Sequence, residues 1–400
     1  MKVLVADAFE TSGLDGLAAL GCEVLYEPKL EGAALGARLA ETGAEVLVVR
    51  GTKVEAPEID AASGLALIVR AGAGVNTIDL RAASARAIAV SNCPGKNAIA
   101  VAELAWGLIL ALDRRIVEQA NDLRAGIWNK ALYGKARGLA GRTLGVIGLG
   151  AIGREVIARA KAFGMPVVAW SRSLDDDLAA RLGIARGDSV HALAAASDVV
   201  TVHCALTNET KGMLDARFFE AMKPGAFFVN TSRGDVVVQA ALEAAIAAKG
   251  IRAGLDVFAK EPAGGSGTFE DGIVKLHGVV GTHHVGASTE QAQNAIAEEA
   301  VRIVAAFAST GDVPNAVNLA SRTPATHVLS VRHRDRVGVL AHVFGVLRAA
   351  GINVEKTENV VFAGAEAACA RIQVGSAPQD GVLEEIRGCA DVLSVSVRAL

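Results

Sequence analysis

One short glycine-rich segment limits the fold of this chain more than any other feature of its sequence. It follows an apolar run at 143–147 and opens a helical pattern at 154–163, which is the order of a strand, a tight turn and a helix. In this setting the first glycine permits the turn, the second lets the backbone approach a pyrophosphate, and the third lets helix and strand pack closely. The segment predicts a dinucleotide-binding unit, with a purely structural turn as the alternative. Its residues are Gly148, Leu149, Gly150, Ala151, Ile152 and Gly153.

Short apolar runs alternate with helical patterns over most of the chain, which is typical of parallel sheets covered by helices on both faces. A first series of strands is expected at 3–7, 23–26, 46–49, 67–69 and 89–91. A second series is expected at 143–147, 167–170, 199–203, 226–229, 253–257 and 279–281. Two doubly wound sheets are therefore predicted, linked by helices at 98–112 and 289–308.

The last part of the chain has a different pattern, in the order strand, helix, strand, strand, helix, strand. These elements are expected at 327–332, 337–350, 353–361, 367–373, 381–389 and 392–398. The order is that of a ferredoxin-like βαββαβ domain. A chain of 400 residues exceeds what one hydrophobic core usually holds. The α/β fold is thus expected in three domains, formed by 1–97 with 288–322, by 98–287, and by 327–400.

The composition excludes several classes of protein. The chain has 40 Lys and Arg residues against 43 Asp and Glu, which argues against nucleic-acid and polybasic membrane partners. Its 5 cysteines are scattered without CxxC pairing, so neither a disulfide framework nor a metal site is expected. With no signal-peptide pattern and no apolar run that could span a bilayer, a cytoplasmic location is the simplest expectation.

Polar residues cluster where three expected strands of the second sheet end, which is where α/β folds bind ligands. These segments are 230–234, 255–262 and 282–289. Together with the glycine loop and the run Val101-Ala102-Glu103-Leu104, they make the chain resemble the D-isomer-specific 2-hydroxyacid dehydrogenases over about residues 1–320.

The resemblance implies a catalytic set of Arg233, Glu261 and His284. A carboxylate beside an imidazole fixes the ring and favours its protonated form, so one pair can serve as base for oxidation and acid for reduction. An arginine can grip the substrate carboxylate with its planar fork. The base is His284 because the family places it directly before a Val-Gly-Ala-Ser stretch, whereas His283 stands where proline is usual.

The resemblance also implies a nicotinamide cofactor, with Thr231 and Asp256 among its contacts. NAD enzymes usually carry an acid for the ribose after the second strand of the unit. Here that position holds Ser171, followed by Arg172. Arg172 could accept a 2′-phosphate, which favours tolerance of NADP, or it could face solvent while Ser171 binds the ribose of NAD.

The first sheet carries two strand ends suited to an anionic substrate. Arg50, Thr52 and Lys53 follow one strand and would suit a phosphate group. Ala73 and Gly74 lie in a glycine-rich strand end whose backbone amides could hold a carboxylate. On their own these residues fit a phosphorylated 2-hydroxy acid substrate and ordinary surface residues equally well, and the choice depends on the C-terminal domain.

The C-terminal domain resembles the ACT regulatory domains, which typically bind amino acids. The resemblance implies an effector such as L-serine at His333, Asp335 and Asn353, although the family has asparagine where Asp335 stands and proline where Val337 stands. The arrangement is similar to the branch of the family that oxidises 3-phospho-D-glycerate in serine synthesis, and it implies a homodimer or homotetramer. The alternatives are an NADPH-dependent glyoxylate or hydroxypyruvate reductase and a non-catalytic, NAD-sensing corepressor.

Overall fold

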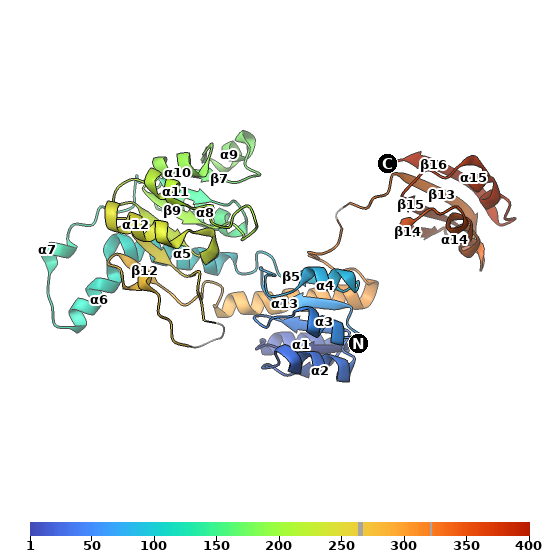
Figure 1. The fold of residues 1–400 in the computed structure, drawn as a ribbon, viewed down its shortest axis with the longest axis horizontal. Helices are drawn as coiled ribbons and strands as arrows, with labels where there is room; N and C mark the ends of the chain where they lie inside the picture. Colours follow the sequence, from blue (N-terminus) through green and yellow to red (C-terminus); the bar gives the residue numbers. More distant parts are fainter. Residues whose placement is uncertain (263–266, 321) are drawn as a thin grey trace. The chain divides into compact units, whose positions relative to one another are not determined.

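The computed structural model describes residues 1–262, 267–320 and 322–400. It divides into two compact units, Met1–Asn318 and Leu319–Leu400 (Figure 1). The first unit contains two parallel sheets and the second contains one antiparallel sheet, which confirms the predicted fold class. Residues 263–266 of the expected second domain and residue 321 of the expected first domain lie outside the described residues.

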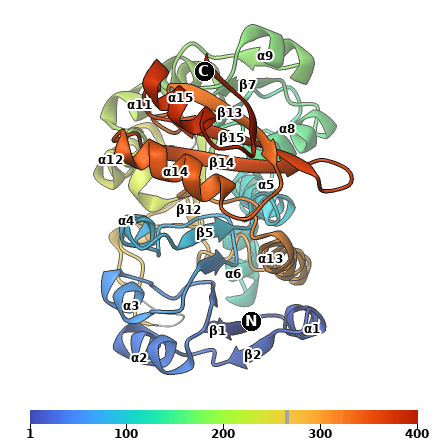
Figure 2. The same cartoon turned by 90° about the vertical axis from the view of Figure 1, so that its right-hand side faces the viewer.

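The first sheet has five parallel strands in the order β2-β1-β3-β4-β5. Alternate side chains of a strand face opposite helices, so Val5 packs with Leu17 while Leu4 packs with Leu35. Figure 2 shows α1 and α13 (Glu290–Thr310) on one face and α2, α3 and α4 on the other. The elements are β1 (Lys2–Val5), α1 (Thr11–Ala19), β2 (Glu23–Tyr26), α2 (Gly32–Thr42), β3 (Val46–Val49), α3 (Ala56–Ala61), β4 (Leu67–Arg70), α4 (Leu80–Ala85) and β5 (Ala89–Asn92).

The second sheet has seven parallel strands in the order β12-β11-β10-β9-β6-β7-β8. The helices α5 (Ala98–Arg114) and α8 pack on one face, and α10, α11 and α12 pack on the other. The elements are β6 (Leu144–Ile147), α8 (Ala151–Ala162), β7 (Val167–Trp170), α9 (Asp176–Leu182), β8 (Ala185–Arg186), α10 (Val190–Ala196), β9 (Val199–Val202), α11 (Ala216–Ala221), β10 (Phe227–Asn230), the 3-10 helix η1 (Gly234–Val236), α12 (Gln239–Lys249), β11 (Arg252–Leu255), the 3-10 helix η2 (Gly272–Lys275) and β12 (Val279–Gly281).

Two helices connect these sheets, as the sequence predicted. The helix α5 (Ala98–Arg114) leaves the first sheet and packs on the second, where the indole of Trp106 donates to the carbonyl oxygen of Val156 at 3.3 Å. The helix α13 returns to the first sheet, where Ile303 and Val304 are buried. The segment after α13 also bonds to β5, because Ser91 Oγ donates to the Pro314 carbonyl oxygen at 2.6 Å.

The second unit has the predicted βαββαβ order, with strands paired as β14-β15-β13-β16. Its core contains Leu329, Val343 and Ile386, from a strand and both helices. The elements are β13 (His327–Arg334), α14 (Val339–Ala349), β14 (Val354–Val361), β15 (Ala367–Val374), α15 (Asp380–Arg387) and β16 (Val392–Ala399).

The structure contains elements that the sequence did not predict. The strand β8 has 2 residues, too few for a pattern. The helices α6 (Ile116–Arg124) and α7 (Lys130–Tyr133) have no buried residues, so no core-facing periodicity marks them. The strands β9 and β11 end before His203 and Val257, which were expected inside strands, because the chain turns at the sheet edge.

Candidate active site

The glycine loop lies between β6 and α8, and each of its glycines meets a distinct steric demand. Gly148 has a φ of 98°, and a Cβ there would lie 2.6 Å from the His203 carbonyl oxygen. A Cβ at Gly153 would overlap the Gly148 carbonyl oxygen. A Cβ at Gly150, the N-cap of α8, would meet no atom within 4 Å. The open space beside a helix N-terminus therefore fits the pyrophosphate of a dinucleotide.

The segment after β10 is fixed by the buried side chain of Asn230. Its Oδ1 accepts from the backbone nitrogen of Ser232 at 3.0 Å and from Ser232 Oγ at 2.8 Å, and its Nδ2 donates to the Arg233 carbonyl oxygen at 2.9 Å. Between them, Thr231 Oγ1 is buried without a hydrogen-bond partner among the described residues. A buried hydroxyl with no partner is costly, so this atom is suited to contact a bound cofactor.

Glu261 and His284 form a close pair. The Nδ1 atom of His284 lies 2.7 Å from Glu261 Oε2, and Glu261 Oε1 accepts from the Phe258 backbone nitrogen at 2.9 Å. Burial on its own would raise the pKa of Glu261, but the hydrogen bonds from His284 and Phe258 and the positive charges of His284 and Arg233 outweigh it and lower that pKa. Glu261 is therefore ionised at neutral pH, and the ring of His284 is held through Nδ1, which leaves Nε2 for a substrate.

The loop that carries His284 is held by Asp256 at the end of β11. The carboxylate of Asp256 accepts from Thr282 Oγ1 at 2.6 Å, from the Val285 nitrogen at 2.9 Å and from the Gly286 nitrogen at 2.9 Å. Its carbonyl oxygen accepts from the His284 nitrogen at 2.8 Å, where His284 takes a φ of 52°. Asp256 was expected among the cofactor contacts. In this structure it is 1% exposed and positions the histidine loop.

Arg233 reaches the strand end of the first sheet that was expected to bind a carboxylate. Its Nη2 donates to Asn76 Oδ1 at 3.5 Å, and a Cβ at Gly74 would lie 2.5 Å from that same nitrogen. Burial lowers the pKa of Arg233 against the opposing charge of Glu261, yet an arginine keeps its proton at neutral pH. The structure therefore brings the glycine-rich segment at 73–76 against the guanidinium of Arg233.

The loop with Arg50, Thr52 and Lys53 lies at the same edge of the first sheet. The carboxylate of Asp7 accepts from the backbone nitrogens of Arg50 at 2.5 Å and Thr52 at 3.0 Å, which fixes the turn. The Val54 nitrogen donates to the Thr77 carbonyl oxygen at 2.8 Å, so this loop lies beside the loop that contains Ala73 and Gly74. Asp7 already accepts the hydrogen bonds of the backbone amides in this turn. A ligand would therefore contact the side chains of Arg50, Thr52 and Lys53.

Sequence reasoning missed Arg70, the last residue of β4. Burial and the positive charges of Arg233 and Arg50 lower the pKa of Arg70 to about 10, and its Nε atom is buried without a partner among the described residues. A Cβ at Gly72 would overlap its guanidinium, so that glycine leaves room for Arg70. Arg50 and Arg233 both repel Arg70, so an anion bound near the three would be favoured. The sequence did contain a signal for this residue, because Arg50 and Arg70 each stand directly after an apolar run that was expected to form a strand.

The residues expected to read the cofactor ribose follow β7. Ser171 Oγ lies 3.4 Å from Ser173 Oγ. Arg172 Nη1 lies 3.4 Å from Glu209 Oε2, and both of these side chains are 70% exposed. The cation that could accept a 2′-phosphate therefore has an acidic neighbour.

Comparison with known proteins identifies the family. Residues 106–286 match the profile described as D-isomer specific 2-hydroxyacid dehydrogenase, NAD binding domain. A hydroxypyruvate reductase from Thermotoga maritima is 41% identical over 260 residues, which are 64% of this chain and 82% of that relative. The chain belongs to this family. As a member it has the NAD-binding domain of the D-isomer specific 2-hydroxyacid dehydrogenases, and the predicted resemblance is confirmed.

Two further relatives are informative. A D-3-phosphoglycerate dehydrogenase from Archaeoglobus fulgidus is 39% identical over 326 residues. These residues are 81% of this chain and 60% of that relative, so the chain spans less than two thirds of its length. The crystal structure of a Thermus thermophilus protein with 35% identity superposes with a TM-score of 0.70, over 79% of this chain and 100% of that one.

The C-terminal unit contains an ACT domain, because residues 327–358 match the ACT profile. Its expected effector residues do not meet within one domain. His333 pairs with Ala368 on β15, whereas Val354, next to Asn353, pairs with Val374 at the far end of the same strand, ~20 Å away. A ligand that contacts both His333 and Asn353 would therefore need two copies of the domain.

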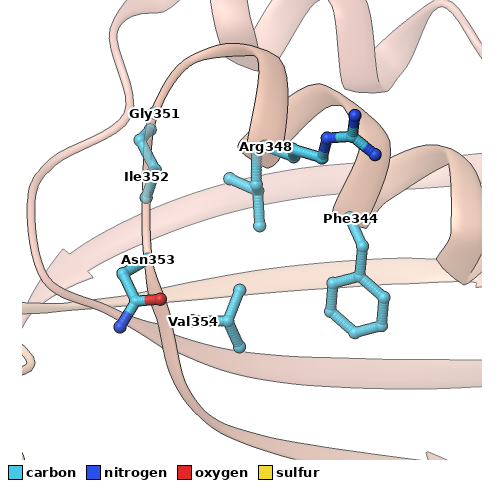
Figure 3. Close-up of a pocket in the computed structure, with 7 residues that line it drawn as sticks. Phe344, Arg348, Gly351, Ile352, Asn353 and Val354 are labelled. Carbon is cyan, nitrogen blue, oxygen red and sulfur yellow. The ribbon is translucent and has the colours of Figure 1, made fainter.

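The three residues also differ in their surroundings. His333 is 1% exposed, with Nδ1 at 2.8 Å from the Arg334 carbonyl oxygen and Nε2 at 3.2 Å from Asn359 Oδ1, so its ring is already engaged. Asp335 is exposed. Asn353 lines a depression of about 570 Å³ with Phe344 and Arg348 of α14 (Figure 3).

The described residues contain no group of three or more His, Cys, Asp or Glu side chains placed to hold a metal ion. His203 lies at the end of β9, where burial lowers its pKa to about 3 and keeps its ring neutral. Within the part of the chain that the structure describes, every helix is too short or too polar to cross a membrane.

Proposed function

We propose that this enzyme oxidises 3-phospho-D-glycerate at C2 and gives 3-phosphooxypyruvate, the first step of L-serine synthesis. The observation that carries the proposal is the pair of His284 and Glu261, 2.7 Å apart, with half-buried arginines supplied by both sheets. The substrate has a hydroxyl to deprotonate and two anionic groups to neutralise, which this arrangement can do at one place. Bound NAD supplies the acceptor for the C2 hydride.

The residues of the chain have separable roles in this reaction. His284 accepts the hydroxyl proton at Nε2, because its Nδ1 is held by Glu261. Glu261 fixes the ring and balances the charge that His284 gains. Arg233, with the Ala73 and Gly74 amides, holds the carboxylate and polarises the oxygen at C2 as it becomes a carbonyl.

The phosphate group is assigned to Arg50, Thr52 and Lys53. Arg70 joins this group, since the positive charges of Arg50 and Arg233 act on it and its Nε has no hydrogen-bond partner among the described residues. These positive charges would surround the carboxylate and the phosphate of the substrate. They therefore disfavour an uncharged substrate and favour a phosphorylated acid.

For the cofactor we propose contacts from the glycine loop with Ala151 and Ile152, from Ser171, and from Thr231, with Asp256 nearby. NAD is the proposed partner, and NADP is tolerated because Ser171 is uncharged. The acidic neighbour of Arg172, Glu209, weakens its attraction for a 2′-phosphate. Arg172→Ala is expected to lower kcat/KM with NADP more than with NAD.

We propose that the protein is a cytoplasmic homodimer or homotetramer. Its three proposed domains are formed by 1–97 together with 288–322, by 98–287, and by 327–400. In support of self-association, Leu123 near the end of α6 and Ile127 and Trp128 after that helix are exposed, the last at 79%. An amino-acid effector such as L-serine would lie between two ACT domains, with His333 and Asp335 from one copy and Asn353 from the other. Light scattering of the purified protein with and without L-serine tests both statements.

A second candidate function is reduction of hydroxypyruvate or glyoxylate with NADPH, which the 41% identity to a hydroxypyruvate reductase favours. The ACT match favours the phosphoglycerate reaction, because it indicates control by an amino acid. A non-catalytic corepressor, the remaining alternative, would show no turnover.

One set of assays separates these functions. Absorbance of the reduced cofactor is followed with 3-phosphoglycerate, hydroxypyruvate and glyoxylate, each with both cofactors. We expect the highest kcat/KM for the phosphorylated pair with NAD, and a loss of at least ~10² in His284→Ala. Higher kcat/KM with glyoxylate and NADPH would transfer the assignment to the reductase, and full activity in His284→Ala would remove the assigned base.

A further inference from the structure

A second cavity lies at the edge of the second sheet opposite the catalytic residues. Arg142 precedes β6, and Phe227 and Arg252 are the first residues of β10 and β11, whereas Arg233 and Asp256 follow those strands. In a parallel sheet these two sets of positions lie at opposite edges. The cavity has a volume of about 280 Å³, and its lining is Asp113, Arg115, Leu132, Tyr133, Lys135, Ala136, Arg137, Arg142, Gly225, Phe227 and Arg252.

Arg142 is the buried centre of this cavity. It is 6% exposed, and its Nε has no hydrogen-bond partner among the described residues. Its Nη1 lies 3.2 Å from Asp113 Oδ1, and its guanidinium lies 4.3 Å from the centre of the Phe227 ring. Burial, with the positive charge of Arg137, lowers the pKa of Arg142. A buried guanidinium with an unmet donor is suited to a ligand that brings negative charge.

The other cations of the cavity exceed the acids that face them. Arg115 Nε and Arg252 Nη2 share a single oxygen of Glu118, at 3.4 Å and 3.0 Å. Lys135 and Arg137 are exposed at the mouth, and neither has a hydrogen bond or ion pair with another described side chain. Five cations thus meet three carboxylates, those of Asp113, Glu118 and Asp198, and the cavity keeps a net positive charge.

We propose that this cavity binds the phosphate group of a small phosphorylated ligand, at a site separate from the substrate and cofactor. Arginine forks bind phosphate oxygens two at a time, and four arginines converge here. The volume is at the lower end of the range for ligand sites, so it suits a small molecule and not a macromolecule. The apolar side chains of Leu132 and Phe227 leave room for a short uncharged part of the ligand.

Isothermal titration calorimetry with pyrophosphate tests the site, on protein saturated with NAD so that the glycine loop is occupied. The cavity variant is Lys135→Ala/Arg137→Ala, chosen because both side chains are exposed and the fold does not depend on them. The matched control, Lys211→Ala/Arg217→Ala, removes the same charges from exposed residues outside the cavity. A third variant, Arg50→Ala/Lys53→Ala, removes anion binding at the proposed substrate site.

We expect the cavity variant to bind one pyrophosphate at least tenfold more weakly, while the other two variants keep that binding event. Unchanged affinity in the cavity variant would overturn the proposal. So would loss of all pyrophosphate binding in Arg50→Ala/Lys53→Ala. Citrate, an anion without a phosphate group, is titrated for comparison with pyrophosphate. Equally tight binding of citrate would show that the cavity does not select phosphate.

Discussion

Substitution of Asp256 by asparagine tests whether one buried carboxylate keeps His284, the proposed catalytic base, in position. In the native protein Asp256 accepts bonds from Thr282 Oγ1 and from the Val285 and Gly286 nitrogens, at 2.6–2.9 Å. An asparagine keeps one acceptor oxygen and replaces the other by an amide nitrogen. Whichever way the amide is turned, that nitrogen faces at least one donor, so a buried N–H or O–H loses its acceptor.

The magnitude follows from these contacts. A hydrogen bond to a charged group contributes about 1.5–3 kcal/mol, and an unsatisfied buried donor costs about 1–3 kcal/mol. Asp256 is 1% exposed, so water cannot take its place. We expect Asp256→Asn to lower the free energy of unfolding by about 2–4 kcal/mol and Tm by roughly 5–10 °C. Displacement of His284 by about 1 Å should lower kcat about 10²-fold.

Calorimetry gives Tm, and cofactor absorbance gives kcat. The control is Thr282→Val, which removes one donor and leaves both backbone bonds to Asp256, so its Tm should fall by less than half as much. A titration of NAD separates the two roles of Asp256, because a residue that only positions the loop leaves NAD affinity nearly unchanged. The reasoning is refuted if Asp256→Asn has the Tm and kcat of the native protein.

Three further outcomes are expected. Hydrogen bonds from Arg302, against the opposing effect of burial, lower the pKa of Glu299 from 4.5 to about 2, so its stabilisation is complete above pH 4.5 and is lost toward pH 2. Glu299→Gln should therefore cost on the order of 2 kcal/mol at pH 7 in urea unfolding and nearly nothing near pH 2; a constant difference across pH would contradict this. Gly153→Ala should weaken NAD binding at least about tenfold in fluorescence titration, because its Cβ overlaps the Gly148 carbonyl oxygen; native affinity would contradict the close packing. Gly74→Ala should raise KM for the hydroxy acid by about tenfold with little change in NAD affinity, since its Cβ would lie 2.5 Å from Arg233 Nη2; an unchanged KM would separate Gly74 from the substrate site.

Local signals were enough to predict the strands and the glycine loop. The loop at 148–153 is specified by contacts within its own βαβ unit, since the Cβ of residue 153 would meet residue 148. The place of His284 beside Glu261 followed from the resemblance to a family. The reason for that placement, the buried Asp256, could not be predicted, because its three partners lie 26 to 30 residues further along the chain.

Other features depend on contacts between distant segments. The burial of Arg70 between two other arginines arises only when β3, β4 and the end of β10 meet. The engagement of His333 by Asn359 requires the pairing of three strands. The helices α6 and α7 have no buried residues, so the sequence there contains no core-facing hydrophobic periodicity that would predict a helix.

The return of α13 to the first sheet has a consequence for synthesis on the ribosome. Val5 belongs to the second strand of the sheet order, yet its face is covered in part by Val304, and β5 donates hydrogen bonds to Pro314 and Asn318. The first hundred residues therefore leave the ribosome with one face of their sheet covered by α1 alone. The second sheet can fold against α5 before α13 is synthesised and covers the rest of that face. Exposure of this apolar face during translation is expected to make the nascent N-terminal segment a client of chaperones until α13 emerges.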